Sequence, residues 1–378
     1  MPHTTPLPQR PFNDEYPLPS AMAASNHDII VIGASAGGIP PLEQLLQGLP
    51  ADLPAAVFIV LHRGAEAQDD VLVWTFQRRT GLQCLVPRQH EPIRPGRVYV
   101  APADLHLLLK ESQVLVTGGP RENYFRPSID TTFRSAAVAF GPRAIGVILS
   151  GMLHDGTAGM EAIKRCGGLC VVQHPEDAQF PSMPRSVLTN LDVDYSVAIA
   201  EMGIVLQDLV HRPADLARER PFDLLLEARI AERYLNNDKN AITTMDIEQT
   251  ARELDQVGDR SPLSCPDCGG ALWRMKQGSV ERYRCHLGHA YNAESMLGRN
   301  RESLEESLWV ALRSLEERKY VLTTMAEEMG ERHPEKASAY QERAGELHLH
   351  VERIRQVLLS FNDTRLDQRD AASPSAGG

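Results

Sequence analysis

The chain has 378 residues, of which 42% are hydrophobic and 24% charged, and its formal net charge at pH 7 is −11. This length allows two or three domains with at least one sizeable core. The negative charge argues against nucleic acid or an anionic membrane as a partner, and no apolar run reaches the roughly 18–20 residues that span a bilayer. Six unevenly placed cysteines do not resemble a secreted disulfide framework. We therefore expect a cytoplasmic protein.

Residues 1–26 are rich in proline and polar side chains and are predicted to be disordered. Between Asp28 and Gly33, residues 29–32 form an unbroken β-branched run, which is typical of a strand buried on both faces of a parallel sheet. A helical pattern follows and ends near Gly48. Strands and helices alternate in this way over 27–212, which predicts an α/β fold with a mostly parallel, doubly wound sheet. We expect further strands at 55–61, 82–86, 97–100, 144–149 and 169–173, a hairpin over 107–116, and helices at 71–79, 128–140 and from 158.

Three polar residues each follow one of these buried strands: Ser35, His62 and Asp155. Ligands bind at the carboxyl ends of such strands. A serine nucleophile needs an imidazole to accept its proton and a carboxylate to orient that imidazole, so the three residues predict a catalytic triad. The stretch 33–37 also fits the Gly-x-Ser-x-Gly pattern of a nucleophile elbow.

Each residue also has a simpler explanation. Ser35 fits a cap in a glycine-rich turn, His62 a packing residue, and Asp155 part of an ordinary Asp-Gly turn. Four other histidines compete for the role of base: His90, His106, His154 and His174.

Several motifs occur in a specific order along this region. They are the segments 31–38, 101–106, 126–130, 147–160 and 182–184, together with His62. On these motifs, residues 28–212 resemble the catalytic domain of the chemoreceptor protein-glutamate methylesterase (CheB) family. The resemblance implies that Ser35 is the nucleophile, His62 the general base and Asp155 the orienting carboxylate. It also implies that the backbone at Met152 and Ala36 supports the oxyanion.

The resemblance further implies an activity, which is hydrolysis of glutamate γ-methyl esters on a chemoreceptor-like helical protein in chemotaxis-type signalling. Glutamine deamidation at the same kind of site is a second implied reaction, and neither needs a cofactor. The implied partners are the methylated receptor and, in the same pathway, a methyltransferase or sensor kinase. The family usually has an N-terminal receiver domain. Residues 1–27 are too few for one, so we expect a stand-alone esterase.

The chain departs from the family pattern at two places. Ala36 stands where the family often has threonine, and Leu153-His154 stand where it often has Gly-Asn. Leu153 is expected to narrow the site, and His154 to add a titratable group beside it. Neither change removes a member of the predicted triad, so activity is expected.

Two other classes of function are compatible with parts of this pattern. A non-catalytic signalling scaffold of the same fold would dock through the C-terminal helices, but it would not need an intact triad. A Rossmann-type nucleotide-binding domain would use the glycines of 33–38. That stretch lacks the second glycine of the dinucleotide fingerprint, and the next strand ends on His62 where a ribose-binding acid is expected.

Residues 213–260 are charged and helical, with helices expected at 222–235 and 246–257, and they predict a linker. The segment 261–292 then predicts a zinc-ribbon-like module. Its cysteines and histidines form two closely spaced groups, which are Cys265 with Cys268 and Cys285 with His286 and His289.

Three thiolates and one imidazole fill a tetrahedral shell, so we predict one structural Zn²⁺ held by Cys265, Cys268, Cys285 and His289. His289 is preferred over His286 because a spacer lets the chain turn back toward Cys285. The alternative is a redox Cys-x-x-Cys pair, for which the βαβ context is missing.

The C-terminal region from 293 to 366 has apolar residues at helical spacing in two runs, separated near Gly330 and Pro334. Two such seams predict an antiparallel helical hairpin in which each helix covers the other. A coiled-coil dimer or a receptor-docking arm is the alternative. Residues 367–378 are predicted to form a disordered tail.

Overall fold

The computed structural model describes residues 26–234 and 247–372, and the predicted disordered lead-in lies almost wholly outside these ranges. The chain forms two compact units. Of the described residues, the first contains 26–234, 247–263 and 270–292, and the second contains 264–269 and 293–372. Each unit is described by itself.

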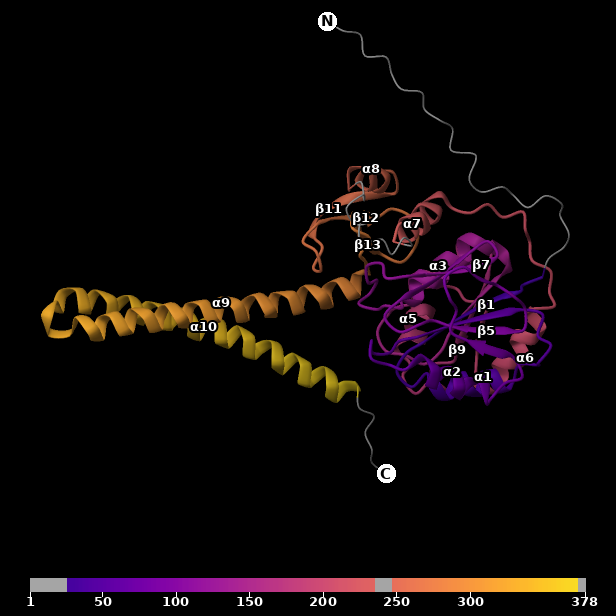
Figure 1. The fold of residues 1–378 in the computed structure, drawn as a ribbon, viewed down its shortest axis with the longest axis horizontal. Helices are drawn as coiled ribbons and strands as arrows, with labels where there is room; N and C mark the ends of the chain where they lie inside the picture. The colour runs from indigo at the N-terminus through magenta and orange to yellow at the C-terminus, as the bar shows by residue number, and fades with distance from the viewer. Residues whose placement is uncertain (1–25, 235–246, 373–378) are drawn as a thin grey trace, which may run out of the picture. The chain divides into compact units, whose positions relative to one another are not determined.

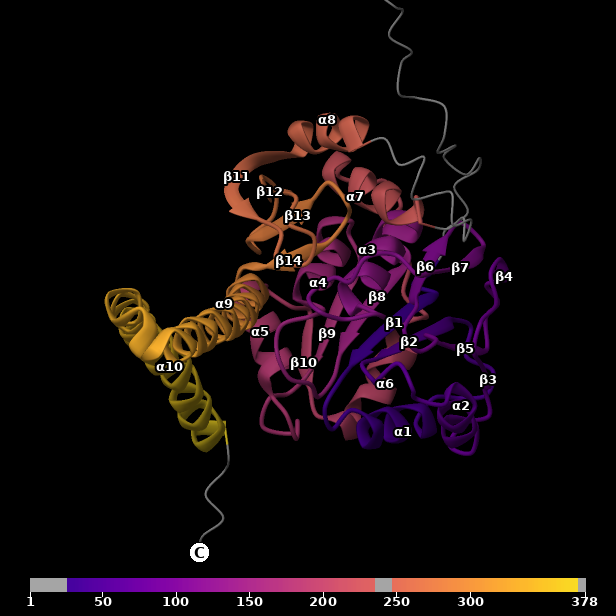
Figure 2. The same ribbon diagram turned by 60° about the vertical axis from the view of Figure 1, so that its left-hand side comes forward.

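The first unit is built on a seven-stranded sheet with the strand order β10-β9-β8-β1-β2-β5-β3 (Figures 1 and 2). All neighbouring strands in this sheet are parallel. The apolar runs are buried throughout β1, β2 and β8, as their composition predicts. The strands are β1 (Ile29–Ala34), β2 (Ala56–Leu61), β3 (Gln83–Leu85), β5 (Arg97–Val100), β8 (Ala144–Ile148), β9 (Leu169–Gln173) and β10 (Tyr195–Val197).

Helices cover both faces of this sheet, so the doubly wound α/β fold is confirmed. Alternate residues of β1 enter two separate cores: Ile29 and Val31 enter one, and Ile30 and Ile32 the other. The first core includes α3 (Ile129–Phe140), α4 (Thr157–Arg165), α5 (Ser182–Asn190) and α7 (Phe222–Glu232). The second includes α1 (Ile39–Gln47), α2 (Asp69–Gln77) and α6 (Ile199–Leu209).

A separate three-stranded antiparallel sheet has the order β4-β7-β6. It contains the predicted hairpin, and Leu107, Leu109 and Val114 from its strands join the first core. The strands are β4 (Glu91–Pro92), β6 (His106–Lys110) and β7 (Gln113–Thr117). A short 3-10 helix, η1 (Gly141–Arg143), leads into β8.

The residues after α6 add a third sheet, which has four strands in the order β11-β12-β13-β14. Its strands are β11 (Gly258–Ser264), β12 (Ala271–Met275), β13 (Arg282–Cys285) and β14 (Ala290–Asn292), and we call β12–β14 the ribbon. Trp273 and Met275 of the ribbon pack with α7 and with α8 (Ile247–Val257) in a common core. The helices expected in a linker are thus part of the packed first unit.

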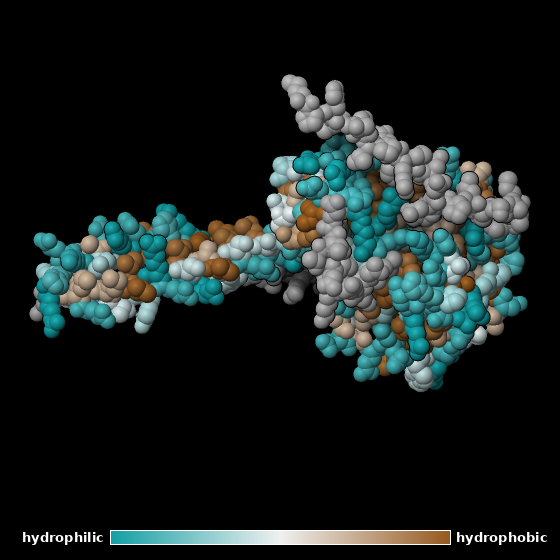
Figure 3. All heavy atoms as spheres, turned by 45° about the horizontal axis from the view of Figure 1, so that its top comes forward, coloured by the Kyte–Doolittle hydropathy of each residue, from teal (hydrophilic) through white to brown (hydrophobic). Residues whose placement is uncertain are grey.

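The second unit contains the predicted helical hairpin, formed by α9 (Ala293–Met329), the short η2 (Gly330–Arg332) and α10 (Pro334–Ala372). Leu312, Val351 and Leu358 are buried between the two long helices. Hydrophobic side chains also appear on the outside of the hairpin (Figure 3). The exposed large hydrophobic residues of α9 include Leu304, Trp309, Val310, Tyr320 and Val321. The helix α10 continues past residue 366. Within the described ranges no helix is long and apolar enough to cross a membrane.

Candidate active site

The structure brings the three predicted catalytic residues together at the carboxyl edge of the sheet. Ser35 follows β1, His62 follows β2, and Asp155 lies between β8 and α4. Because β8, β1 and β2 are neighbours in the sheet, their ends lie side by side. His62 Nδ1 is 3.2 Å from Ser35 Oγ, and His62 Nε2 is 2.8 Å from Asp155 Oδ2. The three side chains form one hydrogen-bonded chain.

The turn that holds Ser35 is tightly packed. The Ser35 N–H donates to Ser150 O at 3.0 Å, and Ser150 Oγ donates to Ala36 O at 3.0 Å. Gly37 has φ +66°, a conformation that favours glycine. Gly151 faces Ser35 so closely that a Cβ on Gly151 would lie 2.9 Å from the Ser35 Cβ. Met152, which is predicted with Ala36 to support the oxyanion, is the next residue after Gly151.

His62 is held by an aromatic ring and by the carboxylate. Its ring stacks on Phe125 with 3.6 Å between ring centroids and 6° between planes. A neutral imidazole with its proton on Nε2 donates to Asp155 and leaves Nδ1 free to accept the proton of Ser35. This tautomer is the one that a general base requires.

Asp155 is 1% exposed and lies at the N-terminus of α3. Burial opposes ionisation. The hydrogen bond and charge of His62, with hydrogen bonds from Asn123 and the Ile129 N–H, nevertheless hold the pKa of Asp155 below its usual value. The carboxylate can therefore stay charged in a buried site. Its donors are His62, Asn123, Ser128 and the backbone N–H groups of Ile129 and Asp130.

A second buried carboxylate, Asp130, lies beside Asp155. Burial and the charge of Asp155 raise the pKa of Asp130 well above its usual value. The Asn123 amide donates to both carboxylates, at 2.7 Å to Asp130 Oδ2 and 3.1 Å to Asp155 Oδ1. Asp130 belongs to one of the sequence motifs, but nothing in the sequence pattern marked Asn123 or Phe125 as part of the site.

The competing histidines have other partners. His106 is buried: its Nε2 donates to Pro120 O at 2.9 Å, its Nδ1 accepts from the Ser128 N–H at 3.2 Å, and burial lowers its pKa. His154 lies 3.3 Å from Ser186 Oγ. Leu153 is 45% exposed, with φ +66°.

The comparison with known proteins shows the family of this chain. The family model described as CheB methylesterase matches residues 30–206. A relative from Leptospira interrogans is 37% identical over 181 residues. It is provisionally named a protein-glutamate methylesterase/protein-glutamine glutaminase. The match covers 47% of this chain and 92% of that relative. The chain belongs to the CheB methylesterase family.

Other relatives are matched over only about half of their own length. A protein-glutamate methylesterase/protein-glutamine glutaminase from Anaeromyxobacter dehalogenans is 34% identical over 186 residues, which is 49% of this chain and 54% of the relative. The chain thus spans about half the length of that relative. A solved structure, the Thermotoga maritima CheB methylesterase catalytic domain, is 32% identical with a TM-score of 0.47, covering 48% of this chain and 98% of that one.

The predicted metal ligands also lie close together. One ligand atom from each of Cys265, Cys268, Cys285 and His289 lies within 4.8 Å of the other three. Three thiols and an imidazole at this spacing fit a closed tetrahedral Zn²⁺ site, which leaves no position for a substrate. Cys285 and His289 face each other across a turn, with 3.5 Å between Sγ and Nδ1. His286 instead lies over Gly270.

We expect the purified protein to contain about one zinc per chain, and the double substitution of Cys265 and Cys268 by serine to release it. Metal analysis of protein prepared under reducing conditions without chelators measures this. His286→Ala is the matched control and should retain the metal. Zinc lost from His286→Ala but kept in His289→Ala would contradict this choice of ligand.

Proposed function

We propose that this protein is a serine-type protein-glutamate methylesterase that acts on a methylated chemoreceptor-like protein in chemotaxis-type signalling. The observation that carries the proposal is the hydrogen-bonded chain from Ser35 through His62 to Asp155 at the carboxyl edge of the sheet. Membership of the CheB methylesterase family supports the substrate class. A cytoplasmic location is part of the proposal, because the methylated glutamates of a chemoreceptor have to be accessible to the enzyme.

In the proposed reaction, Ser35 Oγ attacks the ester carbonyl carbon while His62 Nδ1 takes the hydroxyl proton. The backbone near Met152 and Ala36 supports the negative charge that forms on the carbonyl oxygen. His62 then gives the proton to the departing methoxy oxygen, which leaves as methanol. Water then gives a proton to His62 and attacks the acyl-enzyme, and His62 returns this proton to Ser35 Oγ as the bond to the serine breaks. The product is the glutamic acid side chain, which ionises to the carboxylate. With a glutamine side chain the same steps release ammonia.

Asp155 has two tasks in this scheme. It keeps the Nε2 proton in place, so that Nδ1 faces the nucleophile, and its charge stabilises the imidazolium that forms when His62 takes the proton. The lowered pKa of Asp155 suits both tasks, because the carboxylate remains ionised at neutral pH.

Methanol release from a methylated chemoreceptor fragment tests the proposal. The wild-type protein should release methanol in proportion to the esters lost, and Ser35→Ala should release almost none. A protein that binds the fragment without turnover would instead be a scaffold, and the proposal would be wrong. Binding of a dinucleotide would favour the Rossmann alternative.

A further inference from the structure

A short loop, residues 122–125, contacts the candidate triad. Asn123 donates to Asp155, as described above, and Phe125 stacks on His62. The backbone is left-handed at Asn123, with φ 49°, and at Tyr124, with φ 77°. Residues other than glycine uncommonly adopt this backbone conformation, so the shape of the loop depends on contacts around it.

Those contacts come from the ribbon strand β14. The Asn123 N–H donates to Ala290 O at 2.9 Å, and the Asn292 N–H donates to Asn123 Oδ1 at 2.9 Å. An amide has one oxygen and one NH₂ group. Because the oxygen of Asn123 accepts from β14, its NH₂ group must face Asp155 and Asp130. The backbone of β14 thereby sets the orientation of this side chain.

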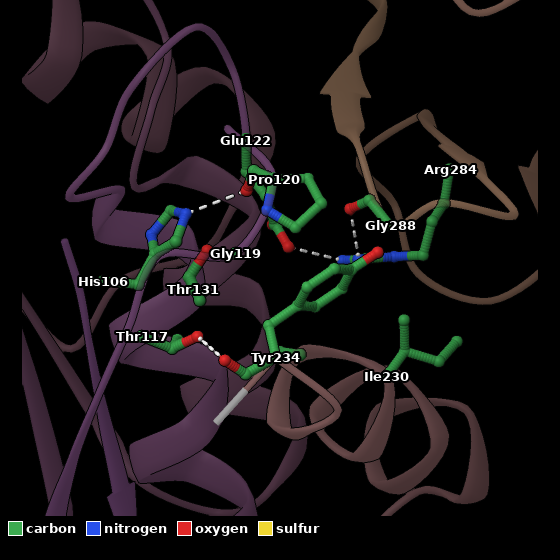
Figure 4. Close-up of a pocket in the computed structure, with 11 residues that line it drawn as sticks. His106, Thr117, Gly119, Pro120, Glu122, Thr131, Ile230, Tyr234, Arg284 and Gly288 are labelled. Carbon is green, nitrogen blue, oxygen red and sulfur yellow. Dashed lines mark hydrogen bonds and ion pairs between the residues drawn. The ribbon is translucent and has the colours of Figure 1, made fainter. Parts of the chain in front are cut away.

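The ribbon is fastened to the loop and to both helices that flank Asp155. Arg284 of β13 donates to Glu122 at 2.8 Å and to Gly288 O at 3.1 Å (Figure 4). Glu122 also accepts from Arg134 of α3 at 2.6 Å. On α4, Glu161 accepts from Ser279 Oγ at 2.7 Å. These contacts, of which those of Arg284 and Arg134 are buried, hold the ribbon against the loop.

We infer that β14 is a positioning element of the catalytic site, which holds Asp155 in place for His62 through Asn123. The inference rests on the proposed function. Residues 290–292 lie outside the segment 30–206 that matches the family model, so the C-terminal part of this chain completes the surroundings of the triad.

Loss of the Asn123 amide has a clear chemical consequence. Asp155 loses a donor, and no NH₂ group remains between it and Asp130. The two carboxylates then repel each other wherever both are charged. A displaced or protonated Asp155 no longer orients His62, so kcat falls. KM stays the same, because Asn123 acts through Asp155 and not on the substrate.

Three variants of the full chain test the inference. Asn123→Gly introduces a residue that tolerates the left-handed backbone, and it removes the side-chain amide. Asn123→Asp keeps the shape and puts a third carboxyl group against the other two. Asn292→Pro removes the N–H that orients the amide. Arg274→Ala, which breaks an exposed ion pair with Glu281 on the ribbon, is the control.

The main readout is the rate at which an organic fluorophosphonate labels Ser35, because this reaction needs an activated serine but no methylated receptor. We expect labelling to slow by about 10–100-fold in the three variants, a part of the about 10²–10⁴-fold that general base catalysis contributes. The downfield ¹H NMR signal of the His62 Nε2 proton should shift or broaden. Arg274→Ala should change neither the labelling rate nor the His62 NMR signal. The parent protein should show both the labelling and the signal whatever its natural substrate is.

Two results would overturn the inference. In the first, Ser35 of the Asn123→Gly variant is labelled at the parental rate and the NMR signal of His62 is unchanged. The other is slow labelling in Asn123→Gly together with folded Asn292→Pro at the parental rate, because β14 would then have no role. If Asn292→Pro does not fold, the hydrogen-exchange rate of the Asn292 N–H is measured in the Asn123→Gly variant instead. Protection of this N–H equal to that in the parent would also overturn the inference. Labelling of Ser35 without methanol release would refute the proposed function alone.

Discussion

Replacing Ser35 with alanine is expected to lower the turnover of methyl ester by at least about a thousandfold, and His62→Ala and Asp155→Asn by a similar factor. The reason is that the three side chains act in one proton-transfer step. His62 lies within hydrogen-bond distance of both partners, at 3.2 Å from Ser35 Oγ and 2.8 Å from Asp155 Oδ2. The measurement is the rate of methanol release at saturating substrate.

The double and triple variants make this prediction specific. Groups that act as a unit do not give multiplying losses, so the triple variant should be about as slow as Ser35→Ala. Ser186→Ala, which removes a partner of His154 but no member of the triad, serves as the control and should keep most of the activity. Losses that multiply across the three positions, or an active Ser35→Ala, would contradict the triad.

The main sheet could be predicted from the sequence because its central strands are unbroken apolar runs. Such runs are stable only where both faces of the strand are buried. The elements that could not be predicted are short or partly exposed: β4 spans Glu91–Pro92, and β10, at the edge of the sheet, spans Tyr195–Val197 with no fully buried residue. Such strands lack a clear hydrophobic period, because neighbouring strands and not their own side chains determine them. The helix α6 was missed as well, although Met202 and Leu206 are buried.

The same difference separates the predicted and unpredicted parts of the candidate site. Ser35, His62 and Asp155 each follow a strong strand signal, so their position at one edge of the sheet follows from topology. Asn123 lies in a loop without periodicity, and its partner Asn292 is far away in the sequence. Only the packing of the ribbon on the loop brings them together.

The ribbon also contains charges that a sequence pattern would assign to the surface. Arg282 and Arg284 alternate with Tyr283 along β13, so both point to the same face, and that face is buried. There they meet Glu227 of α7, with 2.8 Å from Arg282 Nη1 to Glu227 Oε1 and 3.2 Å from Arg284 Nη2 to Glu227 Oε2. This buried ion cluster, with Glu122 and Arg134, connects the ribbon to α3 and α7.

Glu227→Leu is expected to lower the free energy of unfolding at pH 7 by about 3–5 kcal/mol, because it leaves buried guanidinium groups without their counter-charge. Glu281→Gln, in an exposed pair with Arg274, is the matched control and should cost no more than about 1 kcal/mol. Chemical denaturation of both variants and the parent measures the difference. A loss for Glu227→Leu no larger than that of the control would mean that the cluster does not stabilise the fold.

The pH dependence of this loss gives an independent check. Burial opposes ionisation of Glu227, but the charges of Arg282, Arg284 and Arg134 lower its pKa to about 2. In the unfolded chain a glutamate has a pKa of about 4.3. A lowered pKa stabilises the folded state above the unfolded value and loses this effect as the pH falls toward the folded value. The difference in stability between the parent and Glu227→Leu should therefore be constant above about pH 5 and shrink between about pH 4 and pH 2. A difference that grows on acidification would show that Glu227 is not ionised in the folded protein.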